Sequence, residues 1–205
     1  MKKMTNKSLI LMILCVLVVT PCTLCLDTAE PNIPEENDTN HILPNTPLEI
    51  FGAEDKESIQ QLLSSYPKNM MPEEAVTAGF FVILHGVVNE ESKTAWDMFN
   101  ANITQGKDAT VIILQYTIEG DPILNYVSFV NGSFYSVTDT SRDQWGGPNH
   151  YHDGSYQFLK QFEQSIEQTK LITVILSDID YDTIDAYEKD EDRDEKSIYL
   201  FETLN

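Results

Sequence analysis

The chain has 205 residues, of which 41% are hydrophobic, so it is long enough to bury a core of ordinary size. Its 33 acidic and 13 basic side chains give a formal net charge of -20 at pH 7. That charge repels phosphates and argues against a nucleic-acid partner. It fits a solvated protein that is secreted or displayed at a cell surface.

The first 26 residues have the composition of an export signal. Lys2, Lys3 and Lys7 precede an apolar run over residues 9–19, which is the order of a basic n-region and a short h-region. Pro21 then interrupts the run and argues against a long membrane-spanning helix. The sequence therefore predicts an extracytoplasmic protein whose only membrane contact is an N-terminal anchor.

All three cysteines lie in this first segment, so the rest of the chain has none for a disulfide. A cysteine just after an apolar run is typical of bacterial lipid attachment, which makes Cys22 and Cys25 the candidates. Such sites normally have a small residue before the cysteine, whereas Pro21 and Leu24 stand there. Lipid attachment, free secretion and an uncleaved anchor therefore remain alternatives.

Residues 27–47 carry four prolines among Asn, Glu, Asp and Thr, without apolar periodicity. This composition predicts a disordered tether. We expect residues 48–205 to form a single α+β domain.

Two helices are predicted at the start of this domain. The first is a short N-terminal helix that ends before Pro67. Asn89 can cap the main helix, which should cover about residues 90–104. We expect its apolar stripe to pack on a sheet rather than to line a ligand site. The helical spacing rests on Ile59, Leu62, Leu63 and Tyr66 in the first helix and on Ala95, Trp96, Phe99 and Ile103 in the second.

Strands account for most of the remaining apolar residues. The run at residues 111–114 suits a strand that is covered on both faces, and Asn131-Gly132 is a strong signal for a tight hairpin. Residues 156–168 fit a helix and a strand equally well, and residues 178–196 read as a long exposed acidic connection. We expect an antiparallel sheet of about five to six strands with one main helix on a face. The expected strands are residues 80–84, 111–114, 123–130, 133–138, 171–176 and 197–201.

A set of motifs in the centre of the chain resembles a family of uncharacterised exported lipoproteins of Gram-positive bacteria, domain of unknown function 4362. The most specific string is YTIEGDPI, residues 116–123. The other matching residues are Pro72-Glu73-Glu74-Ala75, Gly79, His85-Gly86, Asn89, Phe99, Gly106-Lys107, Gly132, Asp139-Thr140 and Asp143.

The resemblance covers about residues 70–145 and implies export. The family has no assigned activity, so the resemblance implies no catalytic residue or ligand. Its members often carry cysteines in the C-terminal part, and this chain departs from them there.

Five polar residues around the predicted turns could form a ligand surface: Glu119, Asp121, Asp139, Arg142 and Asp143. Paired carboxylates beside a guanidinium can serve acid–base chemistry or ligand binding. Turn formation explains the same residue types, because Asp and Gly favour turns and an Arg can bridge acids in a loop.

Two groups of residues are candidates for a metal site, although ordinary polar loops explain both. His150, His152 and Asp153 are of the types that bind zinc, but they supply too few ligands for a complete site. Residues 178–182 begin like a calcium loop, with Asp178, Asp180 and Asp182. Thr183 and Lys189 then replace the Gly and Glu of an EF-hand.

The sequence contains no nucleophile motif and no phosphate-binding loop. We therefore expect no catalytic residue, cofactor or established metal site, and an enzyme is the less favoured reading. The favoured reading is a monomeric, non-enzymatic module that binds a protein, a wall component or a small molecule. The alternatives are a calcium- or other divalent-cation-binding acidic surface protein and a hydrolase that uses the acidic/Arg cluster.

Overall fold

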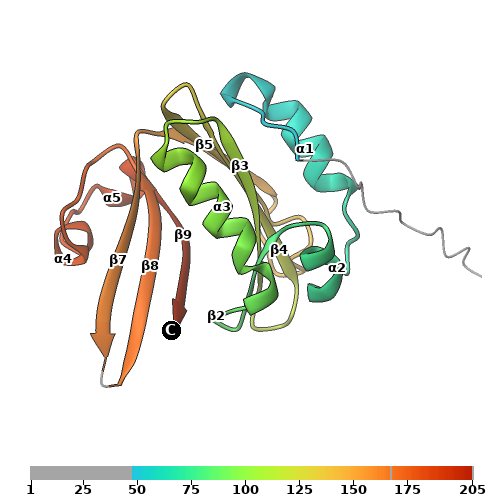
Figure 1. Cartoon of the computed structure of the whole chain (residues 1–205). Coiled ribbons are helices and arrows are strands. Elements are labelled where there is room, and N and C mark those ends of the chain that lie inside the picture. The colour runs from blue at the N-terminus through green and yellow to red at the C-terminus, as the bar shows by residue number, and fades with distance from the viewer. Residues whose placement is uncertain (1–47, 167, 205) are drawn as a thin grey trace, which may run out of the picture. The chain divides into compact units, whose positions relative to one another are not determined.

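The computed structural model describes residues 48–166 and 168–204 (Figure 1). The predicted export signal and tether lie outside these residues. Nine strands form one sheet in the order β6-β5-β4-β3-β1-β2-β9-β8-β7. They are β1 (Phe81–Leu84), β2 (Val87–Val88), β3 (Ala109–Tyr116), β4 (Pro122–Val130), β5 (Ser133–Asp139), β6 (Tyr151–Tyr156), β7 (Phe158–Ile166), β8 (Thr169–Ser177) and β9 (Ser197–Leu204).

The helices of the described residues are short, and the longest, α3, has 12 residues. None of them has the length and apolar character needed to cross a membrane. The α-helices are α1 (Lys56–Ser65), α2 (Pro72–Thr77), α3 (Lys93–Thr104), α4 (Ile184–Glu188) and α5 (Arg193–Lys196), with 3-10 turns η1 (Ala53–Asp55) and η2 (Glu90–Ser92).

The expectation of an antiparallel sheet of five to six strands with one main helix is wrong. The sheet is mixed, because β1 pairs with β3 in parallel and β2 with β9 in parallel. The chain passes through α3 between β1 and β3, and such a crossover allows parallel pairing. The ambiguous segment at 156–168 is strand: β7 occupies most of it and follows β6 directly.

The sheet is strongly curled. Its two edge strands, β6 and β7, are separated in the chain by Gln157 alone. The Gln157 amide donates to the carbonyl of Ser177, 3.2 Å away, at this corner. In Figure 1, α3 lies with β3, β4 and β5 on one side and β7, β8 and β9 on the other.

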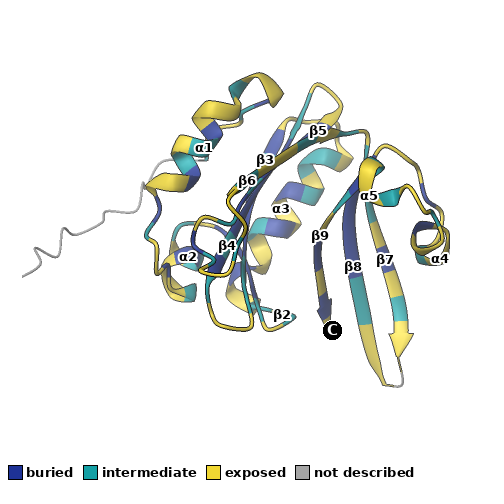
Figure 2. Cartoon of the chain, turned by 180° about the vertical axis from the view of Figure 1, so that it is seen from behind, coloured by how far each residue is buried: buried dark blue, intermediate teal, exposed yellow. Residues whose placement is uncertain are grey.

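Strand β3 is buried on both faces, as predicted. Ile112 and Leu114 pack in a core with residues of α1 and α2, whereas Val111 and Ile113 pack in a second core with Trp96 of α3. Figure 2 shows the central strands largely buried and the outer sides of the helices exposed. A helix forms where its apolar stripe predicted one and buries Trp96 and Phe99, but this helix, α3, is one of several short helices rather than a single main helix.

The predicted Asn131-Gly132 hairpin is also confirmed. Asn131 and Gly132 have φ angles of 52° and 83° and connect β4 to β5, which is the positive-φ geometry of a two-residue turn. A second turn of this kind, His85-Gly86, joins β1 to β2 and was not predicted.

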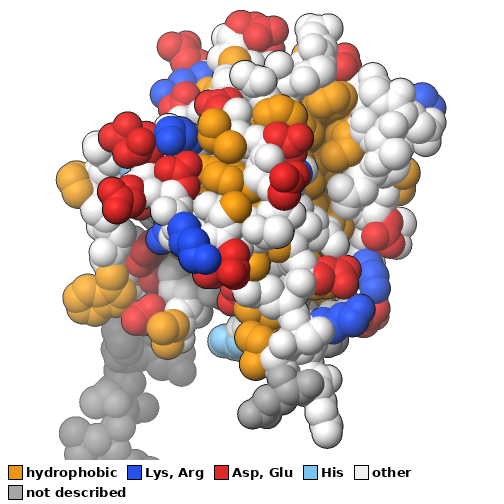
Figure 3. Space-filling view, turned by 90° about the vertical axis from the view of Figure 1, so that its left-hand side faces the viewer, with side chains coloured by type: hydrophobic (Ala, Val, Ile, Leu, Met, Phe, Trp, Pro, Cys, Tyr) orange, Lys and Arg blue, Asp and Glu red, His pale blue; other side chains and the backbone are white. Residues whose placement is uncertain are grey.

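The acidic segment at 178–196 is more ordered than the sequence suggested. It contains α4 and α5, and it buries Tyr181 and Tyr187 against Phe162 and Ile175 of the sheet. Figure 3 shows this side of the molecule, with acidic side chains spread around hydrophobic ones. The segment is therefore packed on the sheet, and only its outer face is solvated.

Candidate functional site

The N-terminal end of α3 is fixed to β1 by side-chain hydrogen bonds. The Asn89 carboxamide oxygen accepts from the amides of Glu91 and Ser92, at 3.0 and 3.3 Å, which satisfies donors that a helix start leaves free. The Ser92 hydroxyl accepts from the Val82 amide at 2.9 Å and donates to the Asn89 carbonyl at 2.7 Å. These bonds set the position of the first turns of α3 on the sheet.

Three aromatic side chains pack together where α3 faces the sheet. Trp96 stacks on Phe81 with ring centres 5.4 Å apart, and Phe201 meets Trp96 edge to face at 5.0 Å. Both geometries are favourable for aromatic pairs. The cluster joins β1, α3 and β9, which are far apart in the sequence.

A cavity of about 230 Å³ lies over this aromatic cluster. Its apolar wall includes Val87 and Leu204, which are 52% and 48% exposed. The rest of its lining contains both polar and apolar side chains. A ligand in the cavity would contact apolar side chains at the bottom and polar side chains at the opening. The lining residues are Phe81, Val87, Val88, Glu90, Lys93, Trp96, Asp97, Asn100, Gln161, Ile172, Phe201, Thr203 and Leu204.

Apart from Trp96, which was expected to be core, no residue of this cavity was singled out from the sequence. The cavity forms because β9 reaches β2, where the Leu204 amide donates to the Gly86 carbonyl at 2.9 Å. Those residues are more than 100 positions apart, and no local sequence pattern predicts that they pair. An apolar pocket with a few convergent polar groups is the usual form of a ligand site.

The predicted acidic/Arg cluster splits into a buried and an exposed part. Arg142 donates to the Asp139 carboxylate at 2.5 Å, and both side chains are buried. The same guanidinium donates to the carbonyls of Leu63, Tyr66 and Pro67, at 2.7, 2.9 and 3.1 Å. This pair therefore ties the end of α1 to the end of β5.

The other three residues of the cluster lie in two loops: Glu119 and Asp121 between β3 and β4, and Asp143 between β5 and β6. The Asp121 carboxylate accepts from the Gln144 amide at 3.0 Å, and the Asp143 carboxylate accepts from the Trp145 amide at 2.9 Å. Both carboxylates border a hollow of about 410 Å³ together with Lys68. Glu119 is exposed at the loop tip.

The candidate zinc residues do not converge. His152 and Asp153 are neighbours on β6, so their side chains point to opposite faces of the sheet. Asp153 pairs with Lys56 and accepts from the Tyr135 hydroxyl at 2.9 Å. Partial burial acts to raise the pKa of Asp153, but the hydrogen bonds from Lys56 and Tyr135 outweigh it and lower the pKa. His150 is exposed in the preceding loop.

The candidate calcium residues are also separate. Asp178, Asp180 and Asp182 are exposed, and Asp180 forms an ion pair with Lys160 at 2.5 Å. Across residues 48–166 and 168–204, no group of three or more His, Cys, Asp or Glu side chains is arranged to hold a metal ion.

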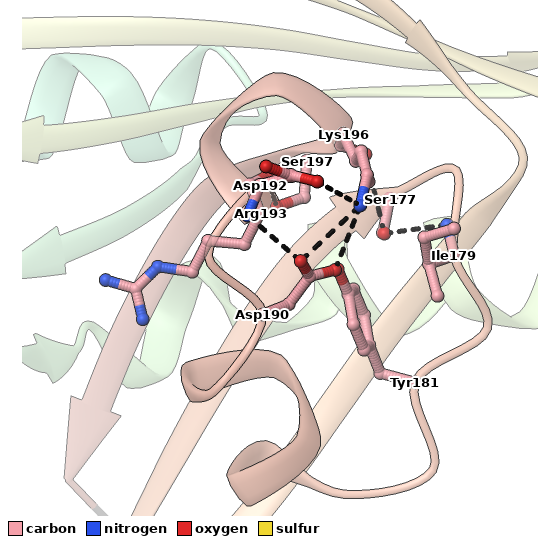
Figure 4. Close-up of polar contacts among 8 residues, drawn as sticks. All are labelled: Ser177, Ile179, Tyr181, Asp190, Asp192, Arg193, Lys196 and Ser197. Atoms are coloured by element: carbon pink, nitrogen blue, oxygen red, sulfur yellow. Dashed lines mark hydrogen bonds and ion pairs between the residues drawn. The ribbon is translucent and has the colours of Figure 1, made fainter.

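The most connected polar group in the acidic segment is centred on Lys196 (Figure 4). Its ammonium lies 3.4 Å from carboxylate oxygens of Asp190 and Asp192, and the Tyr181 hydroxyl donates to Asp190 at 2.6 Å. Burial and this bond to Asp190 raise the pKa of Tyr181 to about 12. The hydrogen bond from the Tyr181 hydroxyl contributes most to lowering the pKa of Asp190. Hydrogen bonds from the Asp192 amide and from Lys196 lower it further. The network joins the two ends of the segment to each other.

Comparison with known proteins gives one match. No curated protein and no solved structure shows significant similarity to the chain. A family model described as Domain of unknown function (DUF4362) matches residues 81–171. The match begins after the α2 motif and extends beyond residue 145, so its limits differ from the expected 70–145. It confirms the resemblance: residues 81–171 of this chain are similar to the domain of unknown function DUF4362.

Proposed function

We propose that this domain is a non-enzymatic binding module that holds an apolar group of its ligand in the cavity beside α3. The observation that carries the proposal is the aromatic floor of that cavity, formed by Trp96, Phe81 and Phe201, beneath a charged rim. Lys93 and Asp97 stand on the rim one helical turn apart, so they lie on the same side of α3.

The size of the cavity limits the part of a ligand that it can enclose. Its volume of about 230 Å³ is below the range of about 300–1,000 Å³ that encloses drug-sized molecules. The cavity therefore suits one apolar group, such as a side chain or a short alkyl segment. The polar remainder of the ligand would stay at the rim, within reach of Lys93, Asp97 and Gln161.

We further propose that the module acts outside the cytoplasm, attached to the membrane through Cys22 or Cys25. Support comes from the basic and apolar composition of the first 26 residues and from the net charge of -20. Under this proposal the ligand is a protein, a wall component or a small molecule that reaches the outer face of the membrane.

Fluorescence can test the ligand site, because the chain has only two tryptophans. Trp96 forms the cavity floor, and Trp145 is 81% exposed. In a Trp145→Phe variant, Trp96 is the sole tryptophan reporter. The probe is 8-anilinonaphthalene-1-sulfonate, an apolar ring system with one anionic group. We expect saturable quenching of Trp96 as the probe enters the cavity.

Two further substitutions on α3 form a matched pair. Asn100 lines the cavity, so Asn100→Phe should fill it and weaken probe binding at least tenfold. Ala101 is exposed on the same helix and does not line it, so Ala101→Phe should leave the affinity unchanged. Equal affinities in the two variants, or an absence of saturable quenching, would refute the cavity as the binding site.

A further inference from the structure

A second surface, whose residues do not line the cavity beside α3, displays two large apolar side chains. Ile118 and Trp145 are 96% and 81% exposed, the highest values among the large hydrophobic residues that the structure describes. Ile118 lies in the β3–β4 loop and Trp145 in the β5–β6 loop. Antiparallel pairing of β3, β4 and β5 places both loops at the same end of the sheet.

The two loops are fastened to each other. The Asp121 carboxylate in the first loop accepts from the Gln144 amide in the second, at 3.0 Å. Trp145 directly follows Gln144, and Ile118 lies three residues before Asp121. The loops that carry Ile118 and Trp145 are therefore joined at this end of the sheet.

Each loop is also ordered from within. In the first, the Gly120 amide donates to the Thr117 carbonyl at 3.0 Å, and the Thr117 amide donates to the Asp121 carbonyl at 2.9 Å. In the second, the Asp143 carboxylate accepts from the Trp145 amide at 2.9 Å. Apolar side chains on ordered loops lose little conformational entropy on binding, and tryptophan is enriched among residues that dominate interface energies.

The charge around these side chains is negative. Glu119, Asp121 and Asp143 lie on the two loops, and Lys68 is the basic residue beside them. The Arg142 guanidinium is buried in its pair with Asp139 and does not offset them. Complementary potentials favour a positively charged partner. A second copy of this chain, with net charge -20, and an anionic lipid surface would both be repelled.

We propose that Ile118 and Trp145 are the apolar anchors of a docking surface for a protein whose binding face is positively charged. The acidic side chains steer that partner and exclude anionic ones, and the buried Asp139–Arg142 pair supports the second loop from beneath. This surface is separate from the cavity over Trp96, so the inference does not depend on the function proposed for that cavity.

The test uses the full-length chain and three labelled synthetic peptides, measured by fluorescence anisotropy. One peptide is composed of Lys and Leu, one of Lys and Ser, and one of Glu and Leu. We expect the Lys/Leu peptide to bind most tightly, with an affinity that falls as salt rises. The double variant Ile118→Ser, Trp145→Ser should weaken it at least tenfold, and Glu119→Gln should weaken it severalfold.

Control variants separate this surface from other parts of the molecule. Met98 is 61% exposed on α3, so Met98→Ser removes an exposed apolar side chain elsewhere and should not change peptide affinity. Asn100→Phe, which fills the cavity beside α3, should not change it either. All five substituted positions are solvent-accessible or at a cavity wall, and an unaltered thermal melt confirms that each variant is folded.

Several outcomes would overturn the proposal. They are an unchanged affinity in the double variant, an equal loss with Met98→Ser, and equally tight binding of the Glu/Leu peptide. Trp145-dependent sedimentation with phosphatidylcholine or phosphatidylglycerol vesicles would instead assign the surface to lipid. Trp145-dependent dimerisation in sedimentation velocity would assign it to a second copy of the chain.

Discussion

The Arg142 guanidinium donates to the Asp139 carboxylate at 2.5 Å, in a position where both side chains are buried. Its other hydrogen bonds go to three backbone carbonyls at the end of α1, those of Leu63, Tyr66 and Pro67. The Leu63 carbonyl also accepts from the Tyr66 amide at 3.4 Å, and a basic side chain near a helix C-terminus can bond the last carbonyls of the chain there. One side chain therefore joins α1 to the sheet.

Removing that guanidinium should be strongly destabilising. Arg142→Ala leaves the buried Asp139 carboxylate unpaired, and breaking a buried pair from one side costs about 3–5 kcal/mol. We expect a loss of this size in the free energy of unfolding, measured by urea denaturation. The matched control is Arg193→Ala, because Arg193 is the chain's other arginine and is partly exposed on α5. An equal loss in both variants would contradict the role of Arg142.

The Lys56–Asp153 pair should make stability depend on pH in the acidic range. Because the folded-state pKa of Asp153 is lowered from 3.8, its contribution is complete above about pH 4 and disappears as pH falls through the folded-state pKa. The effect should be small, since the Lys56 side chain is 46% exposed.

This dependence can be isolated by comparing the wild type with Asp153→Asn in urea melts at pH 7 and pH 3. We expect the variant to be less stable at pH 7 and the difference to shrink at pH 3. Asp185→Asn serves as the control, because the Asp185 pair with Lys189 is highly exposed. A difference for Asp153→Asn that grows at low pH would show that the sign is wrong.

Two threonines with buried hydroxyls should respond differently to the same substitution. The Thr138 hydroxyl is buried without a hydrogen-bond partner among residues 48–166 and 168–204, whereas the Thr173 hydroxyl donates to Glu202 at 3.2 Å. Thr138→Val removes an unsatisfied polar group and should be neutral or stabilising. Thr173→Val removes a hydrogen bond to a carboxylate and should cost about 1–3 kcal/mol.

Thermal melts of the two variants provide the comparison, and both keep a β-branched side chain that suits a strand. A clear loss of stability in Thr138→Val would mean that its hydroxyl has a partner, such as an ordered water. A neutral Thr173→Val would mean that the Glu202 contact contributes nothing.

Lipid attachment can be tested directly on the two candidate cysteines. If the proposal of a lipid anchor is right, metabolic labelling with radioactive palmitate should mark the expressed chain. Either Cys22→Ala or Cys25→Ala should abolish the label, because a single cysteine carries the thioether. Cys15→Ala, within the apolar run, is the control and should keep it. Label-free protein in the culture medium would favour free secretion.

The elements with strong local patterns were predicted well from the sequence. The Asn131-Gly132 hairpin formed as expected because both residues adopt positive φ. The helix at residues 93–104 formed because its apolar stripe packs on the sheet, and it follows a 3-10 turn at residues 90–92 that Asn89 caps. The string around Gly120 also identified the family whose model matches residues 81–171.

The candidate sites were predicted less well. Residue type alone made Asp139 and Arg142 candidates, but it could not show that this pair is buried beside α1. Nor could it show that Asp121 and Asp143 form hydrogen bonds within the neighbouring loops. Nor did it suggest Ile118 and Trp145, because a single apolar residue in a polar loop has no periodic context. Only the tertiary structure shows that the loops carrying these two residues are joined, through the Asp121–Gln144 hydrogen bond.

The sequence by itself determined much of the local structure, such as the helix at residues 93–104, the central strands and the Asn131-Gly132 turn. The tertiary structure alone decided the parallel β1–β3 pairing, the meeting of β2 with β9, and the curl that brings edge strands β6 and β7 together at Gln157. The physical reason is the range of the interactions. Periodicity and turn propensity act over a few residues, whereas strand order and cavities depend on contacts between distant segments, such as Phe81 with Ile113 and Val87 with Leu204.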